Sequence, residues 1–363
     1  MHPQINLKTV VLGTGGTIAG LAVSAENPAN YKASQLGLTD ILHQAGLHTE
    51  GLEMQDVAQI DSKDMGPAVW RLLLKAILHA HERSDVQAVV ITHGTDTLEE
   101  TAFLLEVMGP WPKPVVLTCA MQPANSPTAD GPGNLRDALL LAQHPAFKGV
   151  AVVCAGQAHH PLHVQKIRTD QDDAFSSGLS QPMACMQKGQ WVLGRSDDQP
   201  TSLAQERTPT SAANDSSGAI HVPTPANGHP PDLQTFLNTR DWQTPDLQTL
   251  LNTADWPRVE WISNHANADG ELVLALLAGS AMARRPLRGI IVAATGAGTV
   301  SIELEASLQQ ARAAGVQVWV SSRCVWGEAR FYEDKPYGVA TSLNPAKAMV
   351  ALSLALLAGE HPA

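Results

Sequence analysis

Residues 9–20 read TVVLGTGGTIAG. The first four of them, Thr9–Leu12, form a short β-branched and apolar run that is typical of a buried strand. The glycine-rich turn Gly13–Gly20 follows directly. Parallel α/β sheets bind their ligands at glycine-rich turns of this kind, at the carboxyl ends of strands. We therefore expect a parallel strand whose end forms part of a ligand site.

Outward from this segment, short β-rich runs alternate with longer segments of helical periodicity. Such alternation predicts a parallel α/β sheet. The expected strands are Thr9–Leu12, Ala88–Thr92, Val115–Cys119, Val150–Cys154, Val259–Ser263, Gly289–Ala293 and Val316–Val320. The expected helices are Pro67–His81, Thr97–Met108, Pro132–Gln143, Glu271–Ala283, Val300–Ala314 and Pro345–Leu357. Two helix starts are marked, by a capping box formed by Thr97 with Glu100 and by an N-cap at Asn344.

The composition changes after residue 195, where Pro, Ser, Thr, Asn and Gly become frequent, as in a flexible linker. Two tandem copies of a 14-residue segment follow, at 231–244 and 245–258. We interpret them as a duplicated short helix, with a recognition role as the alternative. The chain is therefore predicted to be an α/β protein with three parts: a larger, mostly parallel N-terminal domain over 1–196, a linker over 197–258 and a smaller C-terminal α/β domain over 259–363.

Composition excludes several classes of protein. The 24 Lys+Arg against 35 Asp+Glu leave a net charge of −11 without a basic run. Binding to nucleic acid or to an anionic membrane needs clustered basic residues, so we expect neither partner. The longest apolar runs have about a dozen residues, whereas a membrane span needs about 20. The length of 363 residues suggests about two domains.

Cysteine and histidine usage points to a reduced protein without a metal site. The four cysteines lie far apart without a CxxC pair, and Cys119 and Cys154 fall inside apolar runs, which predicts free thiols in the core. The 14 histidines include no HExxH motif, so we expect no metal. The N-terminal residues MHPQINLKTVVLG contain no apolar segment with a cleavage site. We therefore expect a cytoplasmic protein, or an exported one already trimmed.

Thr17 stands out because it carries a hydroxyl within a segment of glycines, where little else would cover it. The dinucleotide motif would need glycine at position 18, which is Ile18, and the phosphate-binding loop would need a closing Lys-Ser/Thr pair that is missing. A purely structural turn needs the glycines but not Thr17. Small residues also let backbone N–H groups approach an oxyanion. The pattern therefore indicates a reactive hydroxyl beside an oxyanion site.

A second motif, ITHGTDTLEET at 91–101, follows the strand expected at 88–92. Capping explains Thr97 and Glu100, but it does not require Thr95 and Asp96. For Asp96 the sequence leaves two interpretations open: a functional carboxylate or an alternative N-cap.

Together these two segments resemble the bacterial-type L-asparaginase and glutaminase-asparaginase family. Further segments resemble it too. Residues 61–65, DSKDM, look like the family's substrate-carboxylate loop, and 120–123 with 129–134 look like the segment after the next strand. Lys166 falls where the family has its catalytic lysine. The C-terminal signatures are similar at 263–268, 321–323 and 344–348. The resemblance spans nearly the whole chain except the linker.

The resemblance implies hydrolysis of the L-asparagine side-chain amide, with L-glutamine as a weaker substrate. Thr17 would be the nucleophile and would form an acyl-enzyme ester. Tyr31, the tyrosine of a flexible lid, would polarise Thr17. Thr95 and Lys166 would form a second hydroxyl–amine pair, and Asp96 would complete the catalytic group.

The resemblance also implies how the substrate is held. Asp96 would bind the α-amino group and Ser62 the α-carboxylate. The remaining substrate contacts would come from residues of the same and of a neighbouring subunit: Gly16, Lys63, Thr95, Ala120, Asn267 and Glu333. Glu333 is preferred over Glu328 as the acidic residue. The family assembles as a homotetramer of close dimers, and every role is filled by the chain, so no cofactor is expected.

Lys63 departs from the family pattern, because many relatives have an amide-bearing or small residue there. Its ammonium would either strengthen the grip on the α-carboxylate or point to solvent. Two other functions are alternatives. One is an ammonia-releasing subunit of a tRNA-dependent amidotransferase, whose archaeal members carry an N-terminal domain for which this chain leaves no room. The other is an amino-acid or nucleotide sensor that binds its ligand without turnover.

Overall fold

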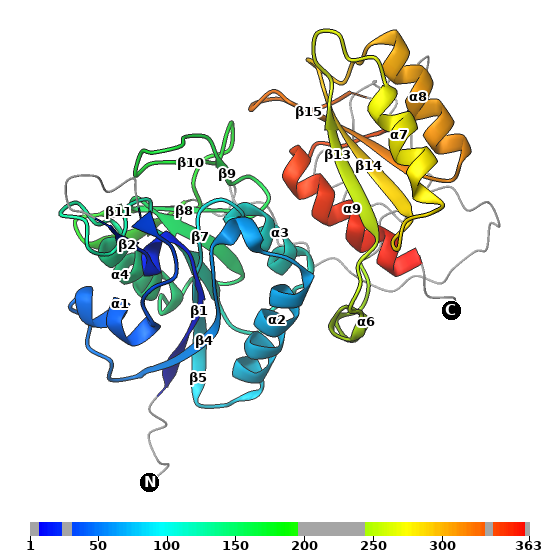
Figure 1. The fold of residues 1–363 in the computed structure, drawn as a ribbon. Helices are drawn as coiled ribbons and strands as arrows, with labels where there is room; N and C mark the ends of the chain where they lie inside the picture. The colour runs from blue at the N-terminus through cyan, green and yellow to red at the C-terminus, as the bar shows by residue number, and fades with distance from the viewer. Residues whose placement is uncertain (1–6, 24–30, 195–243, 331–336, 360–363) are drawn as a thin grey trace. The chain divides into compact units, whose positions relative to one another are not determined.

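The computed structural model describes residues 7–23, 31–194, 244–330 and 337–359. The chain divides into two compact units, Met1–Ser202 and Leu203–Ala363, each with its own sheet and core (Figure 1). Most of the predicted linker lies outside the described residues, so its extent stays a prediction. The second copy of the duplicated segment forms helix α6 (Leu247–Asn252). Its N-cap is Asp246, whose carboxylate accepts the Thr249 N–H at 2.7 Å.

The first unit is built on an eight-stranded sheet in the order β12-β11-β8-β7-β6-β5-β1-β4. Five strands run parallel to one another. They are β1 (Lys8–Gly15), β4 (Leu52–Ile60), β5 (Val86–Thr92), β6 (Val115–Thr118) and β7 (Val150–Cys154). Three antiparallel strands extend the edge beyond β7: β8 (Gln157–His159), β11 (Ala184–Gln187) and β12 (Gln190–Leu193).

Helices cover both faces of this sheet, as in other parallel α/β folds. They are α1 (Leu38–Gln44), α2 (Pro67–Glu82), α3 (Leu98–Val107) and α4 (Gly131–Ala142). Helix α1 contacts α4, and Figure 1 shows these two on one side of the strands with α2 and α3 on the other. Helix α2 buries Trp70, Leu73, Leu74 and Ile77, which recur at helical spacing.

The strand order reverses direction between β1 and β5. The parallel strands follow the order β4-β1-β5-β6-β7, which is second-first-third-fourth-fifth along the chain. In sheets of this order the crossovers diverge between the first and third strands, and ligands bind at the carboxyl ends there. Those strands are β1 and β5, which are followed by the two motifs that the sequence singled out. Two short hairpins flank this edge: β2 (Leu21–Ala22) with β3 (Tyr31–Lys32), and β9 (Gln165–Lys166) with β10 (Phe175–Ser176).

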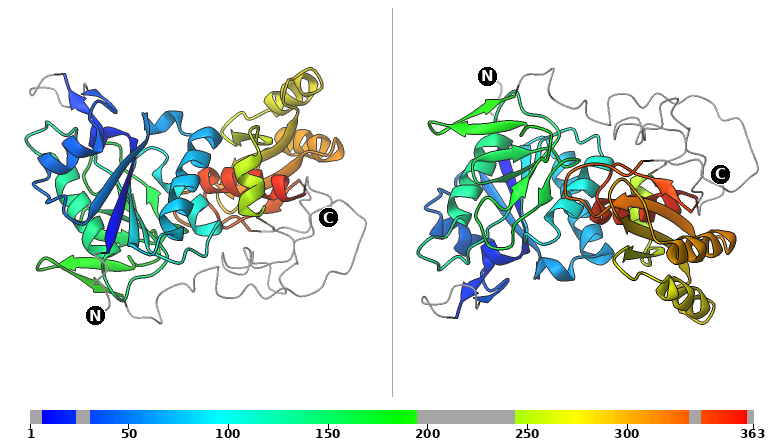
Figure 2. Two further views of the ribbon diagram at one scale, coloured as in Figure 1. Left: turned by 90° about the horizontal axis from the view of Figure 1, so that it is seen from below. Right: turned by 90° about the horizontal axis from the view of Figure 1, so that it is seen from above.

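The second unit has a four-stranded parallel sheet in the order β13-β14-β15-β16. Its strands are β13 (Arg258–Ser263), β14 (Leu287–Ala294), β15 (Gln317–Ser322) and β16 (Val339–Ala340). Helices α7 (Glu271–Ser280) and α8 (Ile302–Ala313) pack together, and α9 (Pro345–Gly359) packs on three of the strands. Figures 1 and 2 show α9 on one face of the sheet and α7 with α8 on the other.

The predicted fold class, a larger mostly parallel α/β domain with a smaller α/β domain, is confirmed. The N-cap at Asn344 is also confirmed, since its side-chain oxygen accepts the Lys347 N–H at 2.9 Å. The capping box at Thr97 is wrong: this residue is the N-cap of α3, but its side chain makes no capping hydrogen bond. Within the described residues, no helix is both long and apolar enough to span a bilayer.

Candidate active site

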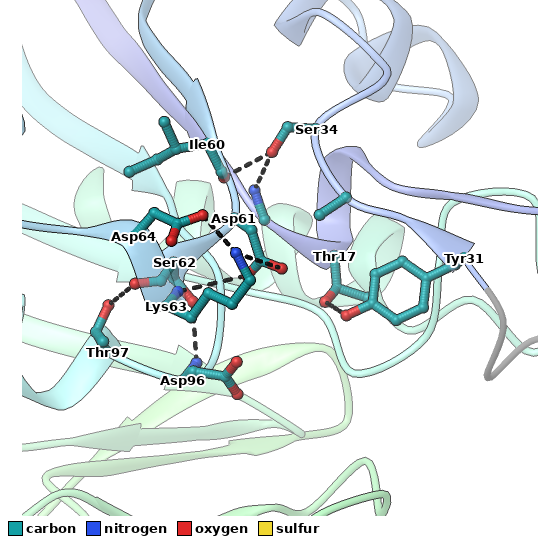
Figure 3. Close-up of polar contacts among 12 residues, drawn as sticks. Thr17, Tyr31, Ser34, Ile60, Asp61, Ser62, Lys63, Asp64, Asp96 and Thr97 are labelled. Atoms are coloured by element: carbon teal, nitrogen blue, oxygen red, sulfur yellow. Dashed lines mark hydrogen bonds and ion pairs between the residues drawn. The ribbon is translucent and has the colours of Figure 1, made fainter.

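The turn after β1 requires glycine and is fixed by three hydrogen bonds. Gly15 and Gly16 have φ values of 99° and 83°, which side-chain-bearing residues rarely adopt. The Gly16 N–H donates to the Ile60 carbonyl and to Ser34 Oγ, both at 2.9 Å. Ser34 in turn donates to the Ile60 carbonyl at 2.6 Å (Figure 3). The turn after β1 is thereby tied to the end of β4.

Thr17 begins a single 3₁₀ turn, η1 (Thr17–Ala19), and its hydroxyl meets Tyr31. The two oxygens, Thr17 Oγ1 and Tyr31 Oη, are 2.8 Å apart (Figure 3). Tyr31 comes from strand β3, which pairs with β2 directly after the glycine-rich turn. The structure therefore brings together the first pair of residues that the resemblance singled out.

Three loops meet beside Thr17: the backbones of Gly16 and Gly94 touch, and the Ser62 side chain touches Gly94. A Cβ added to Gly16 would lie 2.3 Å from the Gly94 Cα. A Cβ added to Gly94 would lie 2.5 Å from Ser62 Oγ. Any side chain at either glycine would force these loops apart. Thr17 and Thr95 each follow one of the two touching glycines, so their hydroxyls share one small region, and each residue is only 6% exposed.

Ser62 lies in the loop after β4, at the start of the turn η2 (Ser62–Asp64). The Asp96 N–H donates to Ser62 Oγ at 3.1 Å, and the Thr97 hydroxyl donates to the Ser62 carbonyl at 2.8 Å (Figure 3). Because Ser62 Oγ accepts the Asp96 N–H, its own proton is available to a ligand. The contact with Ser62 also explains why the Thr97 side chain makes no capping hydrogen bond in α3.

Lys166 joins the site from β9, 70 residues away from Asp96 along the chain. Its ammonium donates to Thr95 Oγ1 at 2.8 Å and to Asp96 Oδ1 at 2.7 Å. The Lys166 side chain is 19% exposed and that of Asp96 is 54% exposed. Asp96 therefore pairs with a cation and does not cap the helix, so the N-cap interpretation of this residue is wrong.

Lys63 is held by carboxylates of its own loop. Its ammonium forms ion pairs with Asp64 and, at 3.9 Å, with Asp61, while the side chain stays 61% exposed. The hydrogen bond to Asp64, with the charges of Asp64, Asp61 and Asp96, raises the pKa of Lys63 above its usual value. Of the two interpretations of Lys63, the geometry favours an exposed residue that ties its loop together.

The segment after β6 is fixed by the partly buried carboxylate of Asp130. Ala120 is fully buried there. Asp130 accepts the N–H groups of Met121 and Gln122, each at 2.9 Å, and Asn134 donates to Asp130 at 3.0 Å and to the carbonyl before Ala120, that of Cys119, at 3.1 Å. Burial raises the pKa of Asp130 despite these bonds.

His93 is a positioning residue that the sequence reasoning missed. It is fully buried, and its Nδ1 lies 2.7 Å from the Gly94 carbonyl. Since a carbonyl only accepts, Nδ1 carries the proton and Nε2 accepts from the Thr101 hydroxyl at 2.9 Å. The Trp70 indole donates to the same Thr101 oxygen at 2.9 Å. Burial lowers the pKa of His93 to about 4, so the ring is neutral and fixes the Gly94 loop.

The two remaining predicted residues belong to the second unit. Asn267 is exposed in the loop after β13 and has a φ of 65°, in the left-handed region that Asn tolerates. Glu333 lies outside the described residues. Among the residues that the structure describes, no group of three or more His, Cys, Asp and Glu side chains is arranged to hold a metal ion.

Comparisons with known proteins identify the same family in both units. The family model described as "Asparaginase, N-terminal" matches residues 8–199, and the one described as "Glutaminase/Asparaginase C-terminal domain" matches residues 258–363. The chain is 32% identical to "Probable L-asparaginase periplasmic" of Haemophilus influenzae, over 97% of this chain and 89% of that protein. It is 30% identical to "Glutaminase-asparaginase" of Pseudomonas fluorescens, over 96% and 85%.

A solved structure is similar as well. The "Probable Cytoplasmic L-asparaginase" from Campylobacter jejuni superposes with a TM-score of 0.75 at 28% identity, over 96% of this chain and 95% of that chain. Two family models and near-full-length relatives thus coincide with a site built at the ends of β1 and β5. The chain therefore belongs to the asparaginase family.

Proposed function

We propose that this asparaginase-family hydrolase converts L-asparagine and water to L-aspartate and ammonia, and hydrolyses L-glutamine more slowly. One observation carries the proposal: two hydroxyl pairs, Thr17 with Tyr31 and Thr95 with Lys166, converge at the carboxyl ends of neighbouring strands. Relatives named both L-asparaginase and glutaminase-asparaginase support the two substrates.

In the proposed reaction, the Thr17 oxygen attacks the side-chain amide carbon. Tyr31, 2.8 Å away, relays the proton: its oxygen accepts the Thr17 proton while its own phenolic proton passes to the leaving nitrogen as the C–N bond breaks. Ammonia departs and leaves an ester on Thr17. Water attacks this ester, L-aspartate leaves, and the Thr17 oxygen regains a proton. Thr95, held by the Lys166 ammonium, has its own hydroxyl proton to donate toward the developing oxyanion.

The same region would bind the α-carboxylate and α-ammonium groups of the substrate. Ser62 has a free hydroxyl proton for the α-carboxylate, because its oxygen already accepts the Asp96 N–H. Asp96 offers the α-ammonium its second carboxylate oxygen, since Oδ1 bonds to Lys166. Gly16 and Ala120 approach the substrate only through backbone or a methyl group, which leaves room for it between the loops.

We further propose a homotetramer in which Asn267 and Glu333 of a neighbouring subunit complete each site. Apolar side chains exposed on the second unit support packing against another copy: Leu272 is 60% exposed on α7 and Trp261 is 50% exposed on β13. Mixing inactive Thr17→Ala chains with impaired Asn267→Ala chains tests the shared site. Activity should return as subunits exchange, since some sites then carry both native residues. Unchanged kinetics of Asn267→Ala alone would count against sharing.

Ammonia release separates this function from its alternatives. The wild-type protein should release ammonia from L-asparagine faster than from L-glutamine, and Thr17→Ala should lose turnover while still binding L-aspartate by calorimetry. Turnover of L-glutamine alone would support the amidotransferase-type subunit instead. Binding of an amino acid without turnover by the wild-type protein would support the sensor.

The proposed location is the cytoplasm. All four cysteines are free, as expected where thiols stay reduced. Relatives carry both periplasmic and cytoplasmic names. Fractionation of the native host, with the protein detected by antibody in the cytoplasmic rather than the periplasmic fraction, tests the location.

A further inference from the structure

Two buried cysteines lie side by side at the carboxyl ends of neighbouring strands. Strands β6 and β7 pair in parallel with Thr118 opposite Val153, which places Cys119 beside Cys154. Both side chains are buried and free, as the sequence predicted. Neighbouring strands lie about 4.8 Å apart, within the roughly 4.4–6.8 Å between Cα atoms that a disulfide spans. The proposed reaction uses neither thiol.

Cys154 has a histidine beside it. In the antiparallel pair β7–β8, Cys154 stands opposite Gln157 and Val152 stands opposite His159. His159 is therefore the diagonal neighbour of Cys154 on the same face of the sheet. The other side of the ring is held in place, since His159 Nδ1 lies 2.8 Å from Ser177 Oγ. A cysteine, a histidine and a group that orients the histidine form the arrangement that activates a nucleophile.

The electrostatics act on the two thiols in opposite directions. Hydrogen bonding from Cys119 and from His159 lowers the pKa of Cys154, against the effect of burial. The same pairing, together with burial, raises the pKa of Cys119. Cys154 is thus the thiol that ionises first, and the thiolate is the reactive form.

A cavity of about 410 Å³ reaches the thiol pair. Cys154, His159 and Ser177 line it, together with the more exposed Cys185. Of the buried pair, Cys154 lines this cavity and Cys119 does not.

We propose that Cys154 and Cys119 form a peroxide-reactive thiol pair that closes to a disulfide. The Cys154 thiol gives up its proton and its sulfur attacks one oxygen of hydrogen peroxide. The O–O bond breaks, and Cys154 sulfenic acid forms while the other oxygen takes up a proton and leaves as water. The Cys119 sulfur then attacks the sulfenic sulfur, the S–S bond forms, and a second water leaves. Two thiols are oxidised and one peroxide is reduced to two waters, so the step balances.

The pair is connected to the proposed active site, and this part of the inference rests on the proposed function. Cys119 directly precedes Ala120, and its carbonyl accepts from Asn134 at 3.1 Å, while Asn134 also accepts the Ala155 N–H at 2.9 Å. The Asn134 side chain thus forms a clamp, a pair of hydrogen bonds that joins the segment at Cys119 to the segment after Cys154. The positive charge of Lys166 also acts on Cys119. Closing the disulfide should pull on this clamp and displace the segment at Ala120.

Peptide mapping tests the thiol pair without any activity measurement. Full-length reduced protein is treated with hydrogen peroxide, blocked with an alkylating agent, digested and analysed by mass spectrometry. The expected product is a linked peptide joining Cys119 to Cys154, with two hydrogens lost and reversal by dithiothreitol. Cys154→Ala should leave Cys119 in the thiol form. Cys185→Ser, which changes another thiol of the same cavity, is the matched control and should leave the linked peptide unchanged.

Activity is measured in parallel on the same samples. Disulfide formation should lower kcat/KM for L-asparagine by roughly tenfold or more, because a misplacement of about 1 Å can cost about 10²-fold. Oxidation confined to Cys185 or Cys324, or Cys154 oxidised while Cys119 stays a thiol, would overturn the proposed pair. A linked peptide with unchanged amidase activity would overturn the connection to the active site. A protein without amidase activity in the reduced state would refute the proposed function and leave the mapping result standing.

Discussion

Replacing Gly16 with alanine should separate the two threonine loops. The new Cβ would lie 2.3 Å from the Gly94 Cα and 2.5 Å from the Gly94 nitrogen, closer than real Cβ contacts. Both neighbours are backbone atoms, so no side chain can rotate away. The backbone at Gly16 also has φ 83° and ψ −167°, a region that is essentially restricted to glycine.

The expected loss of stability in Gly16→Ala is the sum of these two costs. Backbone strain of this kind costs about 1–3 kcal/mol, and inserting a methyl group into a packed site costs about 1–3 kcal/mol. We therefore expect Gly16→Ala to lower the free energy of unfolding by roughly 2–6 kcal/mol. Each kcal/mol shifts Tm by about 2–4 °C in a unit of this size, so Tm should fall by at least roughly 4 °C.

Thermal unfolding by circular dichroism, with L-asparagine kinetics on the folded fraction, measures both effects. Gly133→Ala is the matched control, since its added Cβ meets nothing within 4 Å and its residue lies in helix α4. This control should unfold at or above the wild-type Tm. In Gly16→Ala, kcat should also fall by about 10²-fold if Thr17 and Thr95 move apart by about 1 Å. A Gly16→Ala protein with wild-type Tm and wild-type kinetics would refute the loop contact.

Three further predictions follow from individual contacts. Lys166→Met removes the donor to Thr95 and should lower kcat by about 10²–10⁴-fold with an unchanged far-UV spectrum; retained steady-state activity would exclude its role. Burial raises the pKa of Glu106 to about 7 from 4.5, so its contribution to stability is full below pH 4.5 and is lost as the pH rises through 7. Glu106→Gln should therefore gain up to roughly 3 kcal/mol over wild type on going from pH 5 to pH 8, whereas a pH-independent difference in urea unfolding would contradict the shift. Thr101→Val leaves His93 Nε2 without its donor and should cost about 1–3 kcal/mol in the same urea assay, so equal stability would contradict the chain of bonds.

The sequence predicted best the strands that are buried on both faces. Strands β5, β6 and β7 appear as nearly continuous apolar runs, because helices cover them on each side. It missed β4, where Glu53, Gln55 and Asp56 interrupt the pattern. This strand lies at the edge of the sheet and is only partly buried, so polar side chains are tolerated there. The short antiparallel strands beyond β7 were also missed, because each has only three or four residues and so shows little periodicity.

The site was predicted unevenly. Residues in glycine-rich motifs, such as Thr17 and Thr95, could be picked out because capping or turn formation does not require their hydroxyls. Thr97 was misassigned because local spacing favours a capping box, whereas its hydroxyl binds the carbonyl of Ser62, 35 residues away. His93 escaped notice because nothing in its spacing shows that its two ring nitrogens bond to the Gly94 carbonyl and to the Thr101 hydroxyl.

The parallel α/β class and the two glycine-rich motifs could be predicted from the chain alone, because both depend on local patterns of burial and backbone freedom. Which of the distant groups meet depends on the tertiary fold. The 2-1-3-4-5 strand order brings Gly16 against Gly94, the β9 hairpin carries Lys166 to Asp96, and the register of β6 with β7 sets Cys119 beside Cys154. Such contacts depend on strand order and register, which join segments far apart along the chain and leave no local signal in it.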